Sequence, residues 1–354
     1  MTISESVAGG DLVPAANSED AFRGVGIEPE PMIRRLRQWL LRHGIVVALI
    51  AQFIFFSTQS DRFLAGDNIK LVLTQTAATA VLAVPVGLLL MSGYIDFAVG
   101  SIAGFSAAVM GVYMDGGENN VLMGVLIAIG VGAGVGALQG VLATRLKLAP
   151  IIVTLGFYTG IRGLVFVVND NNLKNKFGSQ FAEIGRGRFP GTDLANPIII
   201  AAAVLLLGWL FLTRTAAGRH TVSLGVNPEA ARRAGISLYK IPFFLYVVTG
   251  AAAGVAALIT AARLDAAPPT LGDGFEIDVL SAVLLGGVAF GGGKGSVPGI
   301  AAGVLFIGFL NNGLLLMGAP PFWLRVSSGL ALVAAAALDG TSRYIENRQR
   351  GGGR

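Results

Sequence analysis

Apolar runs of about the length that crosses a lipid bilayer recur along this chain, and they constrain its fold more than any other feature. A helix needs about 20 apolar residues to cross the hydrocarbon core. Within that core every backbone polar group must be bonded inside the protein, so such runs form helices. The sequence therefore predicts an all-α, polytopic membrane helical bundle with about ten transmembrane helices. The runs are residues 41–56, 71–91, 94–114, 121–143, 150–168, 197–212, 242–262, 279–290, 297–317 and 322–338.

The composition is typical of a membrane protein and excludes several other classes. Charged residues make up 13% of the 354 residues, whereas a soluble domain carries about 25%. The absence of cysteine rules out disulfides, thiolate zinc sites and iron–sulfur clusters. The basic residues lie at the edges of the apolar runs rather than in a stripe with aromatic residues, so no nucleic acid partner is expected.

Two of the runs differ from simple spans. Glycines interrupt residues 94–114 and 279–290, and the second run is short. These features predict one or two broken or re-entrant segments. Glycines spaced four residues apart instead indicate close packing between helices. The spaced glycines are Gly100 and Gly104, Gly132, Gly136 and Gly140, Gly250 and Gly254, and Gly299 and Gly303.

Charge patterning predicts how the chain is oriented and divided. Arginines cluster just before the first apolar run, and the loops on the same side carry most of the remaining basic residues. This bias predicts that the N- and C-termini are both cytoplasmic. We expect a disordered cytoplasmic tail at residues 1–38, a transmembrane domain at 39–340 and a cytoplasmic C-terminal tail at 341–354.

A basic polar segment, residues 214–242, separates two long apolar runs. Asn227 or the Pro228 turn can start a short helix there, with Glu229 in its first turn, Arg232 further on and Gly235 as its stop. A short exposed helix held between two spans can act as a lever on which a soluble partner pushes. The alternative is a loop whose positive charge only orients the protein.

Several polar residues lie within or beside the apolar runs. Asp96 is a functional candidate because an ionisable group is costly at membrane depth, although it can equally cap a broken helix. Thr154, Tyr158 and Arg162 are spaced at four residues and share a helix face. That face can line a path for a hydroxyl-rich substrate, or the threonine can bond back to its own helix.

Three further polar residues belong to the same group of candidates. Ser101 follows Asp96 at the start of a glycine-rich helix. Asn311 and Asn312 lie toward one end of the run at 297–317, where buried amides can bridge helices or line a path.

Two glycine-rich strings imitate nucleotide-binding motifs. Residues 291–296 lack the glycine six positions before Lys294 and the hydroxyl residue directly after it that a phosphate-binding loop requires. Residues 132–137 fit a dinucleotide fingerprint but lie inside an apolar run. No catalytic or metal-binding spacing occurs around His43 or His220, so the chain is not expected to be an enzyme or to bind a metal.

Taken together, these strings resemble a known family. The polar segment contains Gly218-Arg219-His220, Gly225, Asn227, Glu229-Ala230-Ala231-Arg232 and Gly235-Ile236. Further matching strings lie at residues 93–101, 150–163, 181–187, 286–297 and 308–314. In this order they resemble the permeases of monosaccharide ABC importers, of ribose or xylose type, within the branched-chain amino acid and sugar permease superfamily.

The resemblance implies a permease subunit in the bacterial inner membrane that imports a monosaccharide by alternating access. It implies a second copy of the chain, cytoplasmic ABC ATPase subunits, and a periplasmic or lipid-anchored sugar-binding protein as partners. ATP and Mg would be bound by the ATPase, so this chain needs no cofactor. The residues implied to couple to the ATPase are Gly225, Asn227, Glu229, Ala230, Ala231, Arg232 and Gly235.

Two alternatives remain open at this stage. A branched-chain amino acid or nucleoside permease of the same superfamily would share most of these strings. An ion-coupled secondary transporter would require paired acids or a lysine inside the membrane. Asp96 is the one acid that we place within the expected spans, which disfavours the secondary transporter.

Overall fold

The computed structural model describes residues 32–117 and 119–351. The chain divides into two compact units, residues 1–43 and 44–354, and the account below concerns the second. The expected tail at 1–38 lies mostly outside the described residues, but helix α1 already begins at Met32. At the other end, helix α13 continues through the expected C-terminal tail as far as Gly351.

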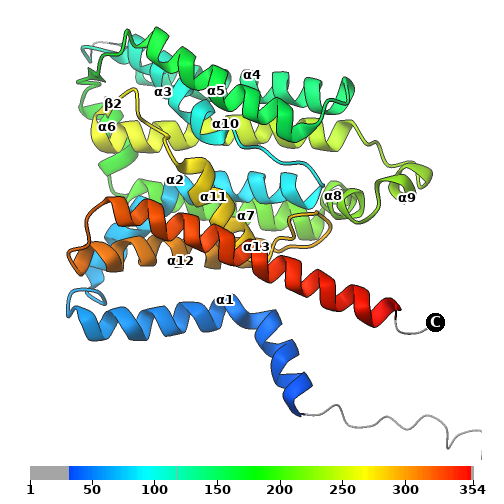
Figure 1. The fold of residues 1–354 in the computed structure, drawn as a ribbon. Coiled ribbons are helices and arrows are strands. Elements are labelled where there is room, and N and C mark those ends of the chain that lie inside the picture. Colours follow the sequence, from blue (N-terminus) through cyan, green and yellow to red (C-terminus); the bar gives the residue numbers. More distant parts are fainter. Residues whose placement is uncertain (1–31, 118, 352–354) are drawn as a thin grey trace, which may run out of the picture. The chain divides into compact units, whose positions relative to one another are not determined.

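The described residues form an almost entirely helical structure (Figure 1). The helices are α1 Met32–Gln59, α2 Gly66–Met91, α3 Val99–Met114, α4 Val121–Gly140, η1 Val141–Arg145, α5 Pro150–Val168, α6 Ser179–Arg186, α7 Asn196–Arg214, α8 Ala216–Val226, α9 Pro228–Arg233, α10 Lys240–Leu264, α11 Phe275–Leu285, α12 Val297–Leu316 and α13 Phe322–Gly351. Two short strands, β1 Lys174–Asn175 and β2 Ala266–Ala267, pair antiparallel.

Among the described residues, six helices are long and apolar enough to cross a membrane. They are α2, α4 with η1, α5, α7, α10 and α12. Shorter apolar helical stretches lie at residues 44–59, 99–114 and 322–337. The chain is therefore a helical membrane protein of the predicted class. Each expected apolar run overlaps a helix, although fewer of these helices than the ten expected have the length and hydropathy of a full span.

Glycines allow the central helices to approach closely, as their spacing predicted. Helix α10 lies between α4 and α2 and packs on both (Figure 1). A Cβ atom added at Gly136 would overlap the Tyr246 carbonyl oxygen, and one added at Gly250 would overlap the Gly132 carbonyl oxygen. The backbones of α4 and α10 are therefore in direct contact. Lipid tails are as apolar as leucine, so helices in a membrane associate through close van der Waals packing of this kind rather than through the hydrophobic effect.

Helices α3 and α11 are shorter than a span and follow non-helical backbone, as predicted for broken segments. The expected limits of the second one were wrong. We placed the eighth run at residues 279–290, but α11 runs from Phe275 to Leu285. The acidic side chains of Glu276 and Asp278 therefore belong to the helix, whereas residues 286–290 form a turn after it.

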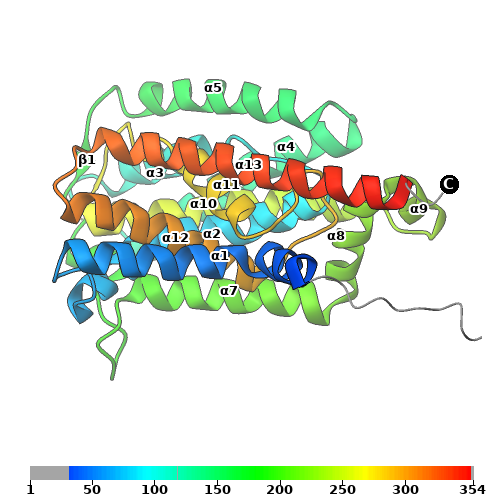
Figure 2. The same ribbon diagram turned by 60° about the horizontal axis from the view of Figure 1, so that its bottom comes forward.

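The loop before α11, residues 268–274, runs inward along α3. At its start, Ala267 lies beside Gly111 of α3; further on, the Leu271 carbonyl lies beside Gly104 and Gly272 beside Gly100. Helix α11 has eleven residues and is therefore about 16 Å long, too short to cross the unit. It begins deep inside the unit, where this inward loop (268–274) ends. In Figure 2, α5 lies along one side of the unit, where it packs mainly on α3.

Candidate functional site

Local side-chain chemistry defines where helix α9 begins. Asn227 has extended backbone geometry, and its side-chain oxygen accepts a hydrogen bond of 3.0 Å from the Ala230 amide. Pro228 occupies the first turn, where its missing amide proton costs nothing. The predicted start of this helix is confirmed.

Glycine closes the other end of α9. Gly235 has a φ of +80°, a conformation that side chains with a Cβ atom rarely adopt. Its amide donates to the Arg232 carbonyl, and the Ile236 amide donates to the Ala231 carbonyl, each at 3.0 Å. This paired arrangement is the Schellman motif that ends many helices. The predicted stop at Gly235 is confirmed as well.

The charged groups of α9 bond to one another. Glu229 accepts hydrogen bonds of 2.7 and 3.0 Å from Arg232 and one of 3.3 Å from Arg233. The bonds from Arg232, followed by the bond from Arg233, hold the pKa of the Glu229 carboxyl below its usual value. All three side chains are more than half exposed, so the ion pairs add little stability. Ala231 is buried, whereas Ala230 faces solvent.

Helix α9 projects beyond the long helices at one end of the unit (Figure 1). We call this the α9 end and the opposite end, with β1 and β2, the strand end. A self-capped, charged helix at the end of a membrane bundle presents a rigid surface to a soluble partner.

Gly225, near the end of α8, is packed against two turns from distant parts of the chain. A Cβ atom added at Gly225 would overlap the Met91 carbonyl oxygen and the Gly293 amide nitrogen. These two atoms are themselves joined by a hydrogen bond of 2.8 Å. A Cβ atom at Gly292 would lie 3.1 Å from the Cα atoms of both Gly225 and Gly93. Four glycines therefore let three backbones meet.

This glycine junction (Gly93, Gly225, Gly292 and Gly293) joins α8 to the two helix breaks. Residues 92–98 separate α2 from α3, and residues 286–296 separate α11 from α12. Because the contact is backbone against backbone, a displacement of the end of α8 would push on both turns. Sequence reasoning singled out Gly225 by resemblance but missed its contacts. The only available signal was the glycine-rich string at 291–296, which we interpreted as an imitation of a phosphate-binding loop.

Asp96 is fully buried in the break before α3. Its Oδ1 atom accepts a hydrogen bond of 2.8 Å from the Ala98 amide and one of 3.4 Å from Gln139 Nε2 of α4. The Tyr246 hydroxyl donates to the adjacent Ile95 carbonyl at 3.0 Å. These contacts favour the structural alternative, in which Asp96 holds the break against α4. No pattern in the sequence indicated that Gln139 is its partner.

The candidate residues on α3 and α5 bond either within their own helix or to another part of the chain. Thr154 donates back to the Pro150 carbonyl at 2.9 Å, which is the ordinary helical alternative. Ser101 donates to the Tyr158 carbonyl at 2.8 Å and so ties α3 to α5. Arg162 instead reaches the inward loop: its Nη1 atom lies 2.9 Å from the Asp273 carboxylate and 3.0 Å from the Leu271 carbonyl oxygen.

Both asparagines of α12 bond to neighbouring helices. Asn312 and Asn68 of α2 exchange side-chain hydrogen bonds of 2.9 Å. Asn311 accepts a bond of 3.3 Å from Ser327 of α13. These contacts favour the bridging alternative over a direct contact with substrate.

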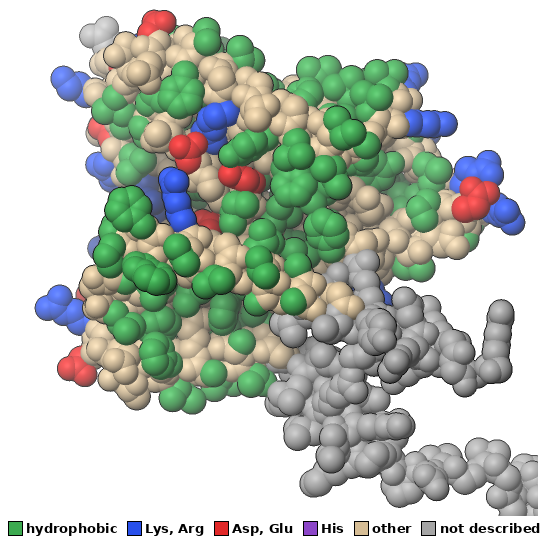
Figure 3. Space-filling model, in the orientation of Figure 1, with side chains coloured by type: hydrophobic (Ala, Val, Ile, Leu, Met, Phe, Trp, Pro, Cys, Tyr) green, Lys and Arg blue, Asp and Glu red, His purple; other side chains and the backbone are tan. Residues whose placement is uncertain are grey.

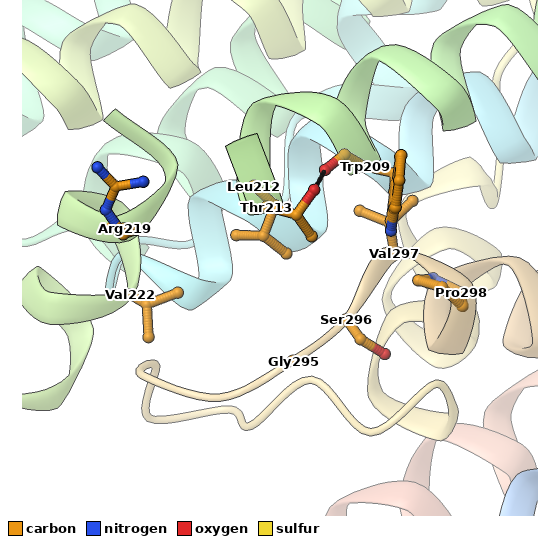
Figure 4. Close-up of a pocket in the computed structure, with 9 residues that line it drawn as sticks. All are labelled: Trp209, Leu212, Thr213, Arg219, Val222, Gly295, Ser296, Val297 and Pro298. Atoms are coloured by element: carbon orange, nitrogen blue, oxygen red, sulfur yellow. Dashed lines mark hydrogen bonds between the residues drawn. The ribbon is translucent and has the colours of Figure 1, made fainter. Parts of the chain in front are cut away.

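A hollow of about 500 Å³ opens beside the polar segment (Figure 4). Its two hydroxyl groups are already engaged: Thr213 donates to the Trp209 carbonyl at 2.6 Å, and Ser296 accepts from the Gly299 amide at 3.1 Å. The remaining lining is mainly apolar, with Arg219 at one edge. The hollow therefore offers little to a polar substrate. Within the described ranges, no three metal-ligating side chains come together.

Comparisons with known proteins identify the family. The family model described as "branched-chain amino acid transport system / permease component" matches residues 68–336. The ribose import permease protein of Escherichia coli strain K12 is 34% identical over 307 residues, covering 86% of this chain and 95% of that relative. The D-allose transport system permease protein of the same strain is 31% identical over 294 residues, covering 83% and 89%.

A third relative extends the group to another organism. The fructose import permease protein of Rhizobium meliloti is 29% identical over 313 residues, covering 85% of each chain. No solved structure matches this chain. The matched family model covers most of the chain, including the polar segment and both helix breaks, and it confirms the resemblance seen in the sequence. This protein belongs to the permease-component family of branched-chain amino acid and sugar transport systems.

Proposed function

We propose that this chain is the transmembrane permease subunit of an ATP-driven ABC importer that moves a monosaccharide from the periplasm to the cytoplasm. The observation that carries the proposal is the glycine junction, which connects the projecting helix α9 to both helix breaks. Relatives similar over most of the chain are named as permeases for ribose, D-allose and fructose. Their shared substrate class supports a sugar over an amino acid or nucleoside.

The proposed assembly contains two copies of this chain, cytoplasmic ABC ATPase subunits against α9, and a periplasmic or lipid-anchored sugar-binding protein at the strand end. The α9 end would then be cytoplasmic, with both termini on that side. The helices that are shorter than a span would complete ten crossings. ATP-driven closure of the ATPases would push on α9, and the junction would pass this movement to the breaks before α3 and after α11.

Asp96 is not the one acid within the membrane helices, because α11 also contains Glu276 and Asp278. The number of acids therefore no longer disfavours an ion-coupled transporter. The energy source therefore needs its own test. We expect uptake into proteoliposomes to require ATP on the side of the ATPase and to continue when a protonophore abolishes the proton gradient.

The binding protein that delivers substrate to this permease is the first protein to measure. We expect one pentose or hexose to raise its thermal unfolding temperature, while nucleosides and branched-chain amino acids do not. The expected sugar should then be taken up by proteoliposomes that contain the complete transporter. Stabilisation by leucine or a nucleoside alone would overturn the sugar assignment and leave the ATP-driven mechanism standing.

Charge reversal or backbone strain in α9 should uncouple the transporter. Glu229→Lys places a third positive charge beside Arg232 and Arg233 and removes the acid from the helix N-terminus. Gly235→Asp places a residue with a Cβ atom at a position whose backbone is left-handed, which costs about 1 kcal/mol of conformational free energy. We expect either variant to remain in the membrane while uptake falls at least tenfold and ATP hydrolysis continues.

Asp61→Lys is a matched control because it reverses an exposed charge in the turn before α2. Uptake and ATP hydrolysis by this variant should stay in the wild-type ratio, because α9 is untouched. Normal uptake by both α9 variants would exclude the proposed lever.

A further inference from the structure

Both broken helices begin at the same depth inside the unit. Helix α3 begins at Val99 and α11 at Phe275. A Cβ atom added at Gly100 would overlap the Glu276 carboxyl group and lie 2.5 Å from the Gly272 carbonyl oxygen. The two helix starts are therefore direct neighbours. Irregular backbone at membrane depth is tolerated where it is buried in protein or lines a water-filled cavity, and discontinuous helices often form transport sites.

Charged side chains gather beside these helix starts. Arg162 lies six residues before the end of α5, about 9 Å from that end. Its side chain is 15% exposed, and that of its partner Asp273 is 38% exposed. Figure 3 shows acidic and basic side chains within a mainly hydrophobic face, between the positions of α5 and α13 in Figure 1. Charges on such a face are costly against lipid, so they face protein or water.

Two complementary atoms in this cluster have no hydrogen-bond partner among the described residues. They are Arg162 Nη2, a donor, and Glu276 Oε2, which can accept. Glu276 is only 7% exposed. Leaving buried charged groups unbonded costs free energy, and such exceptions in a folded protein require an explanation. A sugar hydroxyl is both a donor and an acceptor, so a sugar can satisfy both atoms.

Glycines of α3 provide the room for this arrangement. Glu276 Oε2 reaches over Gly100, and Arg162 Nη1 reaches over Gly104, one helical turn away. A larger residue at either glycine would displace the side chain above it. The glycine pair on α3 therefore makes space for charged groups, whereas the pairs on α4 and α10 make space for a neighbouring backbone.

We propose that Arg162 and Glu276 form a sugar-contact site on the transport path, at the point where α3 and α11 begin. Arg162 Nη2 donates to one sugar hydroxyl, and Glu276 Oε2 accepts from another. Asp273 and the Leu271 carbonyl hold Arg162 in place through its other nitrogen. With only a few such contacts the site is weak, which suits a substrate that must also leave. This proposal rests on the proposed function as a sugar permease.

The first test asks whether water reaches the cluster, and it does not depend on the substrate. The natural chain has no cysteine, so one introduced thiol reports one position. We expect a water-soluble thiosulfonate reagent to label Asp273→Cys in the assembled transporter. Leu207→Cys is the matched control because Leu207 is 64% exposed on the apolar helix α7, where we expect lipid to cover it. Equal labelling of the two thiols would overturn the proposal.

The second test separates sugar contact from structural support. Arg162→Gln and Glu276→Gln keep much of the side-chain shape and remove the charge. We expect uptake of radiolabelled ribose, allose or fructose, whichever the wild type transports, to fall at least tenfold. ATP hydrolysis stimulated by the loaded binding protein and the thermal unfolding temperature should stay near the wild-type values. Lys147→Gln, which removes an exposed charge from the loop before α5, away from the strand end, is the control.

The two proposals fail differently in these experiments. Wild-type proteoliposomes that take up none of the sugars would refute the proposed function, whatever the thiol labelling shows. Wild-type uptake combined with unchanged uptake by both glutamine variants would refute the contact site alone. A parallel loss of uptake, stimulated ATP hydrolysis and thermal stability would assign Arg162 and Glu276 to structural support and would also overturn the proposal.

Discussion

Gly136→Leu should prevent the protein from accumulating in a folded form. Gly136 of α4 lies so close to α10 that even a Cβ atom would overlap the Tyr246 carbonyl oxygen. Backbone atoms cannot rotate away as a side chain can, so a leucine has to push the helices apart. Overpacking of a well-packed core costs about 1–3 kcal/mol and at times more, and separation of the central helix pair belongs at the upper end. Since most proteins are stable by about 5–15 kcal/mol, the loss is severe.

Gly134→Leu provides a closely matched control for this prediction. Gly134 lies two residues away on the same helix, is exposed, and would find open space around an added Cβ atom. The two variants have the same composition and nearly the same helix hydropathy. We expect Gly134→Leu to be extracted as a monodisperse protein with near wild-type thermal stability, and Gly136→Leu to aggregate. Similar behaviour of both variants would show that the α4–α10 contact is looser than the structure indicates.

Gly225→Ala should abolish transport while the protein remains folded. The added methyl group would overlap atoms of the two turns in the glycine junction, and it would force the end of α8 away from them. Helix α9 would remain intact, because its capping contacts involve none of these atoms. We expect the ATPase still to bind and hydrolyse ATP, while sugar uptake falls at least tenfold. Parallel assays in proteoliposomes measure how much sugar is taken up for each ATP hydrolysed.

Gly134→Ala is the control for this substitution, because it makes the same chemical change at an open position. It should leave both activities unchanged. If Gly225→Ala transported normally, the junction would not carry movement from α9 into the membrane. If it abolished ATP hydrolysis as well, the defect would lie in ATPase binding rather than in transmission.

The fold could be predicted from the sequence wherever the interactions that determine it are local. The ends of α9 follow from Asn227, Pro228 and Gly235, whose effects act within a few residues. The helical class follows from apolar runs that must bond their own backbone groups in lipid. The glycine spacing on α4 and α10 likewise predicted a close helix contact, because close approach in lipid requires small residues.

The limits of α11 could not be obtained in the same way. By hydropathy alone, the charged residues Glu276 and Asp278 lie outside an apolar run. The expected segment therefore began after them, at residue 279. In the structure their helix is buried against α2, α12 and α13. The partners of Glu276 include Gly100, which is far away in sequence. No local pattern shows that a distant glycine leaves space for an acid.

The same reason explains the missed contacts of the candidate residues. Asp96 was recognised because an acid near the membrane stands out, but its partner Gln139 is an ordinary polar residue in another run. Gly225 was recognised by resemblance, but its contacts with Met91 and Gly293 arise only when three segments are folded together. Sequence reasoning therefore found positions more readily than it found what those positions touch.

The shortness of α11 has a consequence for how this protein is made. Its eleven residues include two acids, so the isolated segment gains too little free energy to enter a bilayer during synthesis. Helix α12 is synthesised after α11 and packs closely against it. Cβ atoms added at Gly299 and Gly303 of α12 would overlap the Gly286 and Ala282 carbonyl oxygens. We therefore expect α11 to insert only together with α12, as one hairpin. A chain whose synthesis stops before α12 would leave residues 268–285 outside the membrane, with the space beside α3 unfilled.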